Sequence, residues 1–467
     1  MGGMPEPEPF DLHMSDSDAL MWNIEKDPVL RSTIVTVNRL DRDPDWDRLV
    51  ERIDYGSQLI PRLRQRVVTP ILRVGPPHWS ADPDFDLSYH LRRVRAPEPA
   101  TFDTVLDLAR TAAMAGFDRA RPLWEFTLVE GLEDGGAAMI MKVHHSITDG
   151  VGGMKLAMML YDTEREPTPA GPVDEAAVLP HFPPLTLVSR AIDHRRRRAL
   201  GILQRSLGQA FSAAGAVLRS PRAAVDNLAL VGGSVARMLA PATTPRSPIM
   251  HGRSLSRDLG TFSVPLDDLK RAAKGSGCSL NDAFVAGTLG GLRRYHEAHG
   301  VSVDDLRMTM PINLRTDTAQ LGGNHFTPAR FLVPLTYDDP EQRMQAVRTL
   351  SRQVRDEPAI HLTDTLAGVF NQLPTTVATA LFGAMLKGAD FVTSNVPGIP
   401  FPVYLAGAEL LDNYAFGPLS GSAANITLVS HIDSCCIGVN VDRLAVPDRD
   451  EFVRSLRGGF DEVVALA

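Results

Sequence analysis

A histidine-rich motif is the part of the sequence whose residue types and spacing could do chemistry. It reads His144-His145-Ser-Ile-Thr-Asp149-Gly150 and follows an apolar run, AAMIMKV, with the composition of a strand. A random chain with the same His, Asp and Gly content would contain about 0.002 such patterns, so chance does not explain it. An imidazole titrating near neutral pH is the natural general base for a hydroxyl or amine nucleophile. Because adjacent strand residues face opposite ways, we expect one histidine to face a cavity and the other to face the structure.

Two other kinds of site do not fit the motif. Adjacent histidines on a strand diverge, and no other His, Cys and Asp cluster in the sequence has ligand spacing, so we predict no metal site. The Gly-x-Ser-x-Gly elbow of serine hydrolases is absent, and Ser146 beside His145 is not a nucleophile arrangement by itself. The non-catalytic interpretation is a pair of hydrogen-bonded strand-end histidines before an Asp-Gly turn. The complete pattern favours the catalytic interpretation.

Strands and helices are predicted to alternate around the motif. Residues 32–38 are β-branched and alternating, which indicates a strand. Leu123–Val129 and Ala138–Val143 flank the turn Glu-Asp-Gly-Gly and should form a hairpin that ends at the histidines. Helical patterns cover Asp45–Ile53, residues 101–115 and the run MKLAMMLYD after Gly153.

The second half of the chain, from His251, shows the same mixture. Helices are predicted over Leu266–Lys274 and Leu280–Tyr295, the second with Asn281 or Ser279 as its cap. The predicted strands are Leu306–Pro311, Ala329–Pro334, Asp390–Asn395, Ile426–His431 and Cys435–Val441, of which the last two form a hairpin. We therefore expect a mixed α/β protein in two halves of similar size.

The stretch between the halves has a different composition. Eight arginines stand against one acidic residue, Asp193, between Arg190 and Arg222, and four of them form the run Arg195–Arg198. Apolar residues at spacings of three and four predict a basic amphipathic helix or helix pair. It is either a solvated helix between domains or a surface that approaches anionic lipid or the phosphates of an acidic cofactor. The sequence leaves both interpretations open.

The overall composition is that of a folded, cysteine-poor chain. Of 467 residues, 44% are hydrophobic and 22% are charged, and the net charge of −8 argues against a nucleic-acid binder. Cys278, Cys435 and Cys436 have no disulfide or metal spacing, so we expect plain core or strand thiols in a reducing compartment. We find no targeting segment and no run of about 18 apolar residues, so a membrane-spanning helix is not expected. Peripheral attachment to lipid stays open.

The motif resembles HHxxxDG of the CoA-dependent acyltransferase superfamily, and further segments resemble bacterial wax ester synthase/diacylglycerol acyltransferases. The resemblance extends from about Ser15 to Asp448. Its segments are Trp79 with residues 82–90, Pro122-Leu123-Trp124, Asn281-Asp282, residues 311–315, Gly322-Gly323-Asn324, residues 394–398 and Gly417–Asn425. HHxxxDG alone indicates the superfamily, and the ordered set indicates the family.

This resemblance implies a fold and a reaction. The fold is α/β (α+β), with two chloramphenicol-acetyltransferase-like domains, each a mixed β-sheet flanked by helices, and a tunnel between them. We assign residues 1–185 to the first domain, 186–250 to a basic helical connector and 251–467 to the second domain. The implied reaction transfers a long-chain acyl group from CoA to a lipid hydroxyl, with diacylglycerol the favoured acceptor and a long-chain alcohol next. Acyl-CoA is then a co-substrate, and no cofactor is permanently bound.

The resemblance also implies roles for the motif residues. His145 is the general base that takes the proton of the acceptor hydroxyl, without a covalent acyl-enzyme. His144 is expected to face away and to be hydrogen-bonded structurally. Asp149 is expected to hold the motif loop through an arginine, for which Arg315 is the candidate, and Gly150 to give the backbone room.

The donor to the tetrahedral oxyanion is less well defined. Asn281, Ser394 and Asn395 are candidates from the family blocks, and Asp282 is expected to hold the loop of Asn281. A helix cap is the alternative for Asn281, and a strand end before a turn is the alternative for Ser394-Asn395.

The sequence leaves the substrate open. Residues 413–422 carry Phe-Gly but lack the DFGWG block of plant relatives. The alternatives are an acyltransferase for another lipid or polyketide alcohol or for an amine, and a non-catalytic lipid-surface protein with the same fold. We expect a cytoplasmic protein, with peripheral contact to the inner membrane face or to lipid droplets as a further option, and no nucleic-acid partner.

Overall fold

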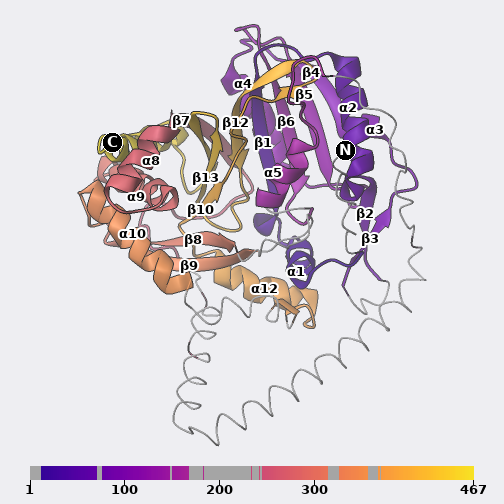
Figure 1. Ribbon diagram of the computed structural model, residues 1–467. Helices are drawn as coiled ribbons and strands as arrows, with labels where there is room; N and C mark the ends of the chain where they lie inside the picture. Colours follow the sequence, from indigo (N-terminus) through magenta and orange to yellow (C-terminus); the bar gives the residue numbers. More distant parts are fainter. Residues whose placement is uncertain are drawn as a thin grey trace, which may run out of the picture.

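A computed structural model gives the fold of the chain. It describes residues 12–70, 76–147, 150–167, 182, 233, 241, 244–313, 326–355, 367–368 and 370–467. Asp149, Arg315 and nearly all of the predicted basic connector lie outside the described residues. Two six-stranded sheets with helices packed against them make up most of the described fold (Figure 1).

The first sheet carries the histidine motif, and its strand order is β11-β12-β1-β6-β5-β4. The predicted hairpin is confirmed, because β5 and β6 pair antiparallel and β6 ends at His144. The sheet is mixed, since β4 and β5 run parallel. Its strands are β1 (Thr33–Leu40), β4 (Leu91–Arg95), β5 (Trp124–Glu130), β6 (Ala137–His144), β11 (Tyr404–Leu405) and β12 (Ala408–Phe416). Helices α2 (Trp46–Leu59) and α5 (Gly150–Met158) pack on one face, and α4 (Phe102–Met114) packs on the other.

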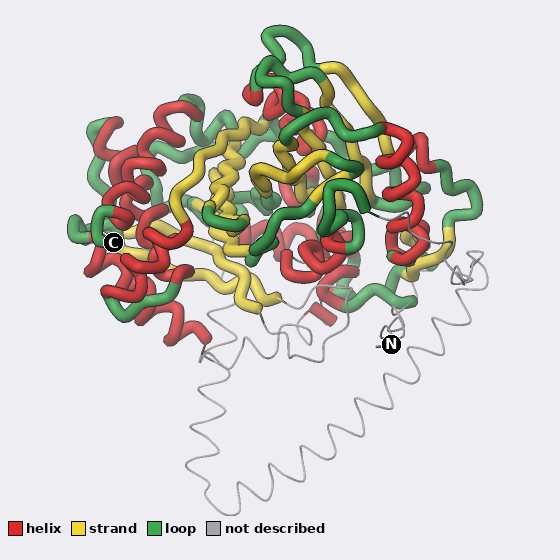
Figure 2. Tube along the Cα trace, turned by 45° about the horizontal axis from the view of Figure 1, so that its top comes forward, coloured by secondary structure: helices red, strands yellow, loops and turns green. Residues whose placement is uncertain are grey.

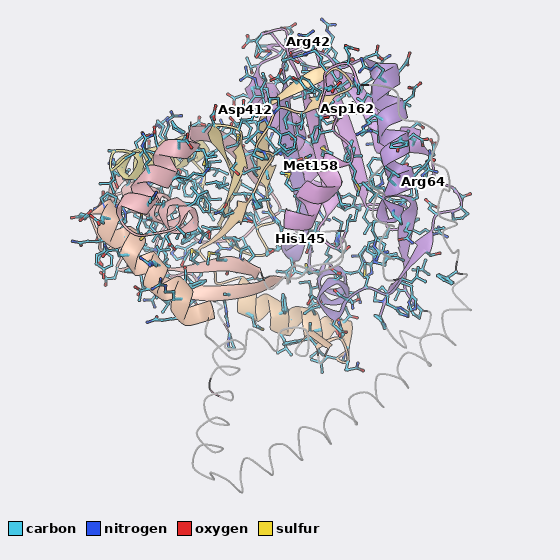
Figure 3. The ribbon with its side chains drawn as sticks, viewed as in Figure 1. Arg42, Arg64, His145, Met158, Asp162 and Asp412 are labelled. Atoms are coloured by element: carbon cyan, nitrogen blue, oxygen red, sulfur yellow. The ribbon has the colours of Figure 1, made fainter. Side chains whose placement is uncertain are left out.

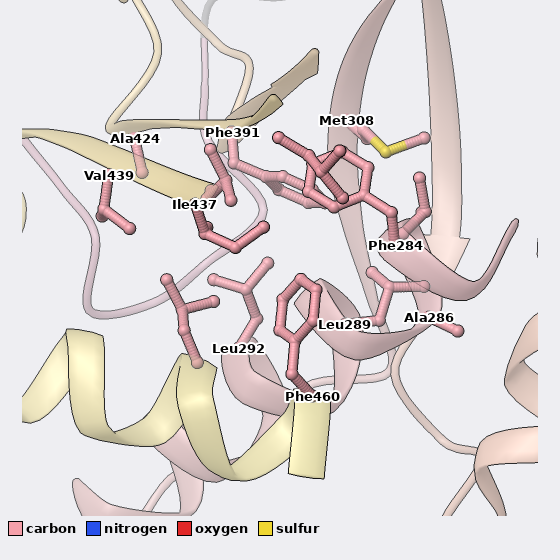
Figure 4. Close-up of a cluster of buried hydrophobic side chains, with 14 of the residues drawn as sticks. Phe284, Ala286, Leu289, Leu292, Met308, Phe391, Ala424, Ile437, Val439 and Phe460 are labelled. Atoms are coloured by element: carbon pink, nitrogen blue, oxygen red, sulfur yellow. The ribbon is translucent and has the colours of Figure 1, made fainter. Parts of the chain in front are cut away.

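The second sheet has the order β7-β14-β13-β10-β8-β9 and is also mixed. Its strands are β7 (Arg257–Pro265), β8 (Asp305–Asn313), β9 (Phe326–Pro334), β10 (Phe391–Val396), β13 (Ala424–His431) and β14 (Ser434–Asp442). The helices that share its core are α8 (Leu266–Gly275), α9 (Leu280–Ala298), α10 (Pro340–Arg355) and α13 (Arg449–Val464). Figure 4 shows part of this core, in which Phe284, Leu289 and Phe460 of the helices face Ile437 of the sheet.

Two glycines let α9 and α13 cross at close range. A Cβ atom at Gly459 would lie 2.1 Å from the backbone nitrogen of Gly291, far inside van der Waals contact. Only glycine therefore fits at this crossing without moving a helix.

Strand β12 ties the two halves of the chain together. It comes from the second half of the sequence but pairs antiparallel with β1 in the first sheet, with Asn413 opposite Asn38. It also passes close to the second sheet, since a Cβ atom at Gly438 of β14 would meet the carbonyl oxygen of Ala415 at 2.1 Å. Figure 2 shows the strands of both sheets next to each other in the middle of the molecule. The domain boundaries at residues 185 and 251 stay a prediction.

Smaller elements complete the described fold. Helix α1 (Asp16–Ile24) and helix α12 (Thr375–Leu386) lie beneath the sheets in the view of Figure 1 and contact each other. The others are the helices η1 (Pro28–Leu30), η2 (Pro61–Arg64) and α3 (Leu87–His90), and the strand pair β2 (Gln65–Val68) and β3 (His78–Ala81). None of the helices within the described residues is long and apolar enough to span a membrane.

Among the described residues, the predicted strands and helices are present, most of them within a few residues of their predicted bounds, although α2 continues six residues past the predicted Ile53 to Leu59. The predicted basic helix or helix pair over 190–222 lies outside the described residues. Of the two caps considered for α9, the structure has Ser279, whose hydroxyl accepts from the Asp282 backbone while the Asp282 carboxylate accepts from the Ser279 backbone. Helix α5 ends at Met158, before the end of the apolar run that predicted it. All three cysteines are free, with Cys435 and Cys436 buried on β14.

Candidate active site

A cavity of about 390 Å³ lies between the two sheets. Strands β1 and β6 of the first sheet and strands β8, β10 and β13 of the second all contribute to its wall. Most of the lining side chains are apolar, and His145 is among them. Figure 3 shows His145 just beyond the end of β6, between the two halves.

His145 reaches this cavity because of strand alternation. Its backbone N–H donates to the Ser32 carbonyl at 2.8 Å, which continues the pairing of β6 with β1 for one residue beyond His144. Met141, Val143 and His145 alternate on one face, and all three line the cavity.

His144 points the other way and is fully buried. The Ser146 backbone N–H donates to its Nδ1 at 3.0 Å, so Nδ1 accepts and the proton of the neutral ring lies on Nε2. Nε2 then donates to Glu25 Oε1 at 2.9 Å. The rings of Trp22 and Phe117 contact the imidazole edge-on. Both ring nitrogens of His144 are therefore engaged in fixed hydrogen bonds.

Glu25, just after helix α1, connects the two histidines. Its Oε1 accepts from the Ser32 backbone N–H at 2.7 Å, and the Ser32 carbonyl in turn holds the His145 backbone. Burial opposes ionisation of this carboxyl, but the hydrogen bonds from His144 and Ser32 and the nearby Arg119 outweigh it and lower the pKa of Glu25. Sequence reasoning missed Glu25, because it lies 119 residues before His144 and carries no motif.

The oxyanion candidates separate into two groups. Ser394 and Asn395, at the end of β10, line the cavity, whereas Asn281 and Asp282 are not among the lining residues. Asn395 Nδ2 donates to Asn281 Oδ1 at 3.4 Å, so Asn281 lies behind Asn395 as seen from the cavity. Asp282 is buried and belongs to the cap of α9.

The remaining motif residues are only partly described. Gly150 is the first residue of α5. Asp149 and its predicted partner Arg315 lie outside the described residues. Within the described ranges, no group of three or more His, Cys, Asp or Glu side chains has an arrangement that would hold a metal ion.

Two groups of elements, far apart along the first sheet, supply different parts of the cavity wall. One end, the α12 end, includes Arg330, whose Nη1 donates to the Met385 carbonyl at 3.1 Å. Its other walls are mainly apolar side chains of α1, α12 and the residues before α12: Leu20, Met21, Ile24, Ala367, Phe370, Phe382, Met385 and Leu386. The other end, the α5 end, runs between α5 and strands β1 and β12 and includes Asn38 and Asn413. A general base in the wall of such a cavity can activate a hydroxyl on an apolar substrate.

Two family models match the chain. The wax ester synthase/diacylglycerol acyltransferase catalytic domain matches residues 14–284, and the WS/DGAT C-terminal domain matches residues 322–463.

Curated relatives match along nearly the whole chain. A Mycobacterium tuberculosis protein named "Putative diacyglycerol O-acyltransferase" is 41% identical over 454 residues, which are 96% of this chain and 91% of that protein. Another protein of that name and species is 30% identical over 86% of this chain and 89% of its own length.

Solved structures share the fold. A wax ester synthase/diacylglycerol acyltransferase from Marinobacter aquaeolei superposes with a TM-score of 0.61 at 21% identity, covering 97% of this chain and 98% of that one. The first condensation domain of the calcium-dependent antibiotic synthetase gives a TM-score of 0.60 at 15% identity, covering 97% and 95%. The predicted fold class, two mixed sheets flanked by helices as in this acyltransferase superfamily, is confirmed.

Proposed function

Because the chain belongs to the wax ester synthase/diacylglycerol acyltransferase family, we propose that it transfers a long-chain acyl group from acyl-CoA to the free hydroxyl of diacylglycerol, giving triacylglycerol. The observation that carries the proposal is the position of His145 in the wall of a mostly apolar cavity between the two sheets. The 41% identical relative with its diacylglycerol acyltransferase name supports this acceptor.

The proposed chemistry is a direct transfer. His145 removes the hydroxyl proton of the acceptor while its oxygen attacks the thioester carbonyl carbon. The tetrahedral oxyanion collapses, the carbon–sulfur bond breaks, and the protonated His145 returns the proton to the CoA thiolate. General-base help of this kind is typically worth about 10²–10⁴ in rate, and holding both substrates in one cavity contributes further.

The surrounding residues have supporting roles in this proposal. Glu25 and Ser146 hold His144, and Ser32 holds the backbone of His145, so the backbone position of the base is set before substrate arrives. Asn395 and Ser394, which line the cavity, are the favoured oxyanion donors, and Asn281 orients Asn395. Asp149, paired with Arg315, and Gly150 are proposed to shape the motif loop.

We propose that the protein meets its lipid substrates at a surface. The helix α12 contains no charged residue, and its outward side chains Val377 and Leu381 are 43% and 47% exposed while Phe382 and Leu386 line the cavity. A helix that is apolar on both sides matches a lipid–water boundary better than water. The basic stretch 190–222, the other candidate for lipid contact, lies outside the described residues.

An acceptor panel tests the proposed reaction. Labelled hexadecanoyl-CoA would be offered to the purified protein with diacylglycerol, monoacylglycerol, hexadecanol or a long-chain amine. We expect triacylglycerol as the main labelled product and wax ester from hexadecanol as the second. Labelled amide as the main product, or no transfer to any acceptor, would refute the proposal.

A further inference from the structure

Two asparagines face each other in the wall of the cavity. Asn38 of β1 and Asn413 of β12 are directly opposite in the register of the first sheet. Their side chains are only 1% and 6% exposed, and both line the cavity at its α5 end. The other side chains that line the α5 end are largely apolar, such as Met154, Ala157 and Leu160.

The carbonyl oxygens of both amides lack a partner within the described residues. The Nδ2 of Asn38 is directed at the thioether of Met141 at 3.1 Å, and sulfur is a weak acceptor. Buried amides normally find good partners, because a buried polar group without one costs free energy. By contrast, the buried Asn425, also in the cavity wall, donates to the Pro418 carbonyl and accepts from Thr427.

Strand geometry gives the distance of the pair from the chemistry. Thr33 lies opposite His144, and Asn38 lies five residues further along β1. At about 3.4 Å per residue, the pair is about 17 Å along the strand from the level of the histidines. Ile34, Thr36 and Asn38 share the cavity face, so a chain extended from His145 along β1 would reach the asparagines.

We propose that Asn38 and Asn413 form a specificity site that binds a hydrogen-bonding group, an amide or a hydroxyl, carried by the substrate chain at the α5 end of the cavity. This inference rests on the proposed function and deepens it. An amide or hydroxyl both donates and accepts, and thus pairs with the side-chain amides, whereas a plain hydrocarbon would leave them unpaired. A site built to bind such a group discriminates strongly against chains that lack it. The α12 end, whose walls are mainly apolar apart from Arg330, is left for the plain hydrocarbon chain.

This chemistry has two sources among the substrates of an acyl-CoA enzyme. The pantetheine arm of CoA carries two amides, and an oxygenated acyl chain carries a hydroxyl along its length. Both would present the same kind of group to the pair, and the substrates used in the test separate them.

The test uses Asn38→Leu and Asn413→Leu, with Asn440→Leu as the matched control. Asn440 is also a buried asparagine with an unpaired carbonyl oxygen, but it does not line the cavity. Its Nδ2 donates to the Gly417 carbonyl at 2.9 Å, so the control variant should have a lowered thermal midpoint but no change in donor preference. Leucine is close to asparagine in size, and the change removes two unpaired carbonyl oxygens at the cost of no hydrogen bond stronger than that of Asn38 to the Met141 thioether, so little stability should be lost. We therefore expect the ligand-free thermal midpoint of the two cavity variants to be unchanged or raised.

Four acyl donors are compared at a fixed acceptor concentration: octadecanoyl-CoA, 12-hydroxyoctadecanoyl-CoA, and the thioesters of the same two acids with ethanethiol, which has no amide. If pantetheine occupies the site, the cavity variants lose about tenfold or more in kcat/KM with both CoA donors and nothing with the ethanethiol thioesters. If an oxygenated chain occupies it, the loss is confined to the two hydroxylated donors. The Asn440 variant should show neither pattern.

Two results would overturn the inference. One is unchanged kcat/KM with all four donors in cavity variants that fold normally. The other is a uniform loss with every donor together with a lowered thermal midpoint, which would mark a structural role. Failure of the proposed function looks different, because the unaltered protein would then transfer acyl groups from none of the CoA donors.

Discussion

The two adjacent histidines have different surroundings and, in the proposed function, different roles. His144 has both ring nitrogens engaged, with Ser146 on Nδ1 and Glu25 on Nε2, while His145 lines the cavity. Glu25 holds the ring of His144 directly and the backbone of His145 through Ser32. Within the proposed mechanism, Glu25 is thus a positioning residue for the base.

Glu25→Gln should make stability respond differently to pH. The pKa of Glu25 is lowered in the folded protein, so its ionised form contributes stability that is fully present above the unfolded pKa, about 4.5, and is lost as pH falls through the lower folded pKa. We expect the free energy of unfolding of the variant to be lower by about 1.5–3 kcal/mol at pH 7, the range for a charge-assisted hydrogen bond. That difference should shrink as pH falls below about 4.5. Urea unfolding from pH 3.5 to 7 measures it, and a gap that stays constant with pH would contradict the assignment.

The divergence of the two histidines could be predicted from the sequence, but the residues that hold them in place could not. Strand alternation was enough to expect that the two histidines diverge. It could not reveal Glu25, because the contact joins an unremarkable residue near the N-terminus to a strand end 119 residues later. Asn281 and Asn395 were singled out as equals, yet only Asn395 lines the cavity, a difference that depends on how β10 packs beside α9.

At the scale of elements, those with local sequence signals were predicted, whereas a strand that depends on a distant partner was not. The hairpin of β5 and β6 has its own turn, and α9 starts with a capping box formed by Ser279 and Asp282. Both elements were therefore predictable from nearby sequence. Strand β12 was missed, since its partner β1 lies more than 370 residues earlier and its residues mix polar and apolar side chains. The cavity wall beside Asn38 depends on that pairing and so could not be predicted.

The crossing of α9 and α13 predicts a localised loss of stability. Gly459→Val would place side-chain atoms inside the backbone of α9 at Gly291 and force the helices apart. We expect a loss of about 1–3 kcal/mol or more in the free energy of unfolding, as for other overpacked cores. Gly275→Ala is the control, because nothing lies within 4 Å of a Cβ atom there. Equal stability of the two variants in thermal or urea unfolding would show that the helices do not pack as described.

At the scale of the molecule, a mostly apolar cavity lies between the two sheets, and the proposed function makes it the route for lipid. The α12 end of the cavity and the exposed side of α12 belong to the same helix, so lipid contact and lipid entry coincide in this account. The net charge of −8 spread over 467 residues gave no hint of this apolar surface. Composition is an average over the whole chain. The exposed apolar side chains Val377 and Leu381 of α12 can be recognised only once the fold shows which side of the helix faces outward.

Charges on the outer side of α12 should uncouple the protein from lipid. We expect the double change Val377→Glu and Leu381→Glu to reduce binding to vesicles of phosphatidylcholine and diacylglycerol about tenfold or more, because burying an apolar side chain is worth about 1.5–3 kcal/mol. Activity with a water-soluble short-chain acceptor should stay close to normal. Leu444→Glu is the control, since Leu444 is 60% exposed and lies away from the cavity lining. Cosedimentation that is the same for both variants would count against α12 as the contact.

The most direct test of the central claim is the rate of triacylglycerol formation from labelled hexadecanoyl-CoA and diacylglycerol by His145→Ala, measured beside His251→Ala, an exposed histidine outside the cavity lining. We expect a loss of about 10²–10⁴ in kcat for His145→Ala with its thermal midpoint retained, and a normal rate for His251→Ala. A His145→Ala protein that forms triacylglycerol at the unaltered rate would contradict it.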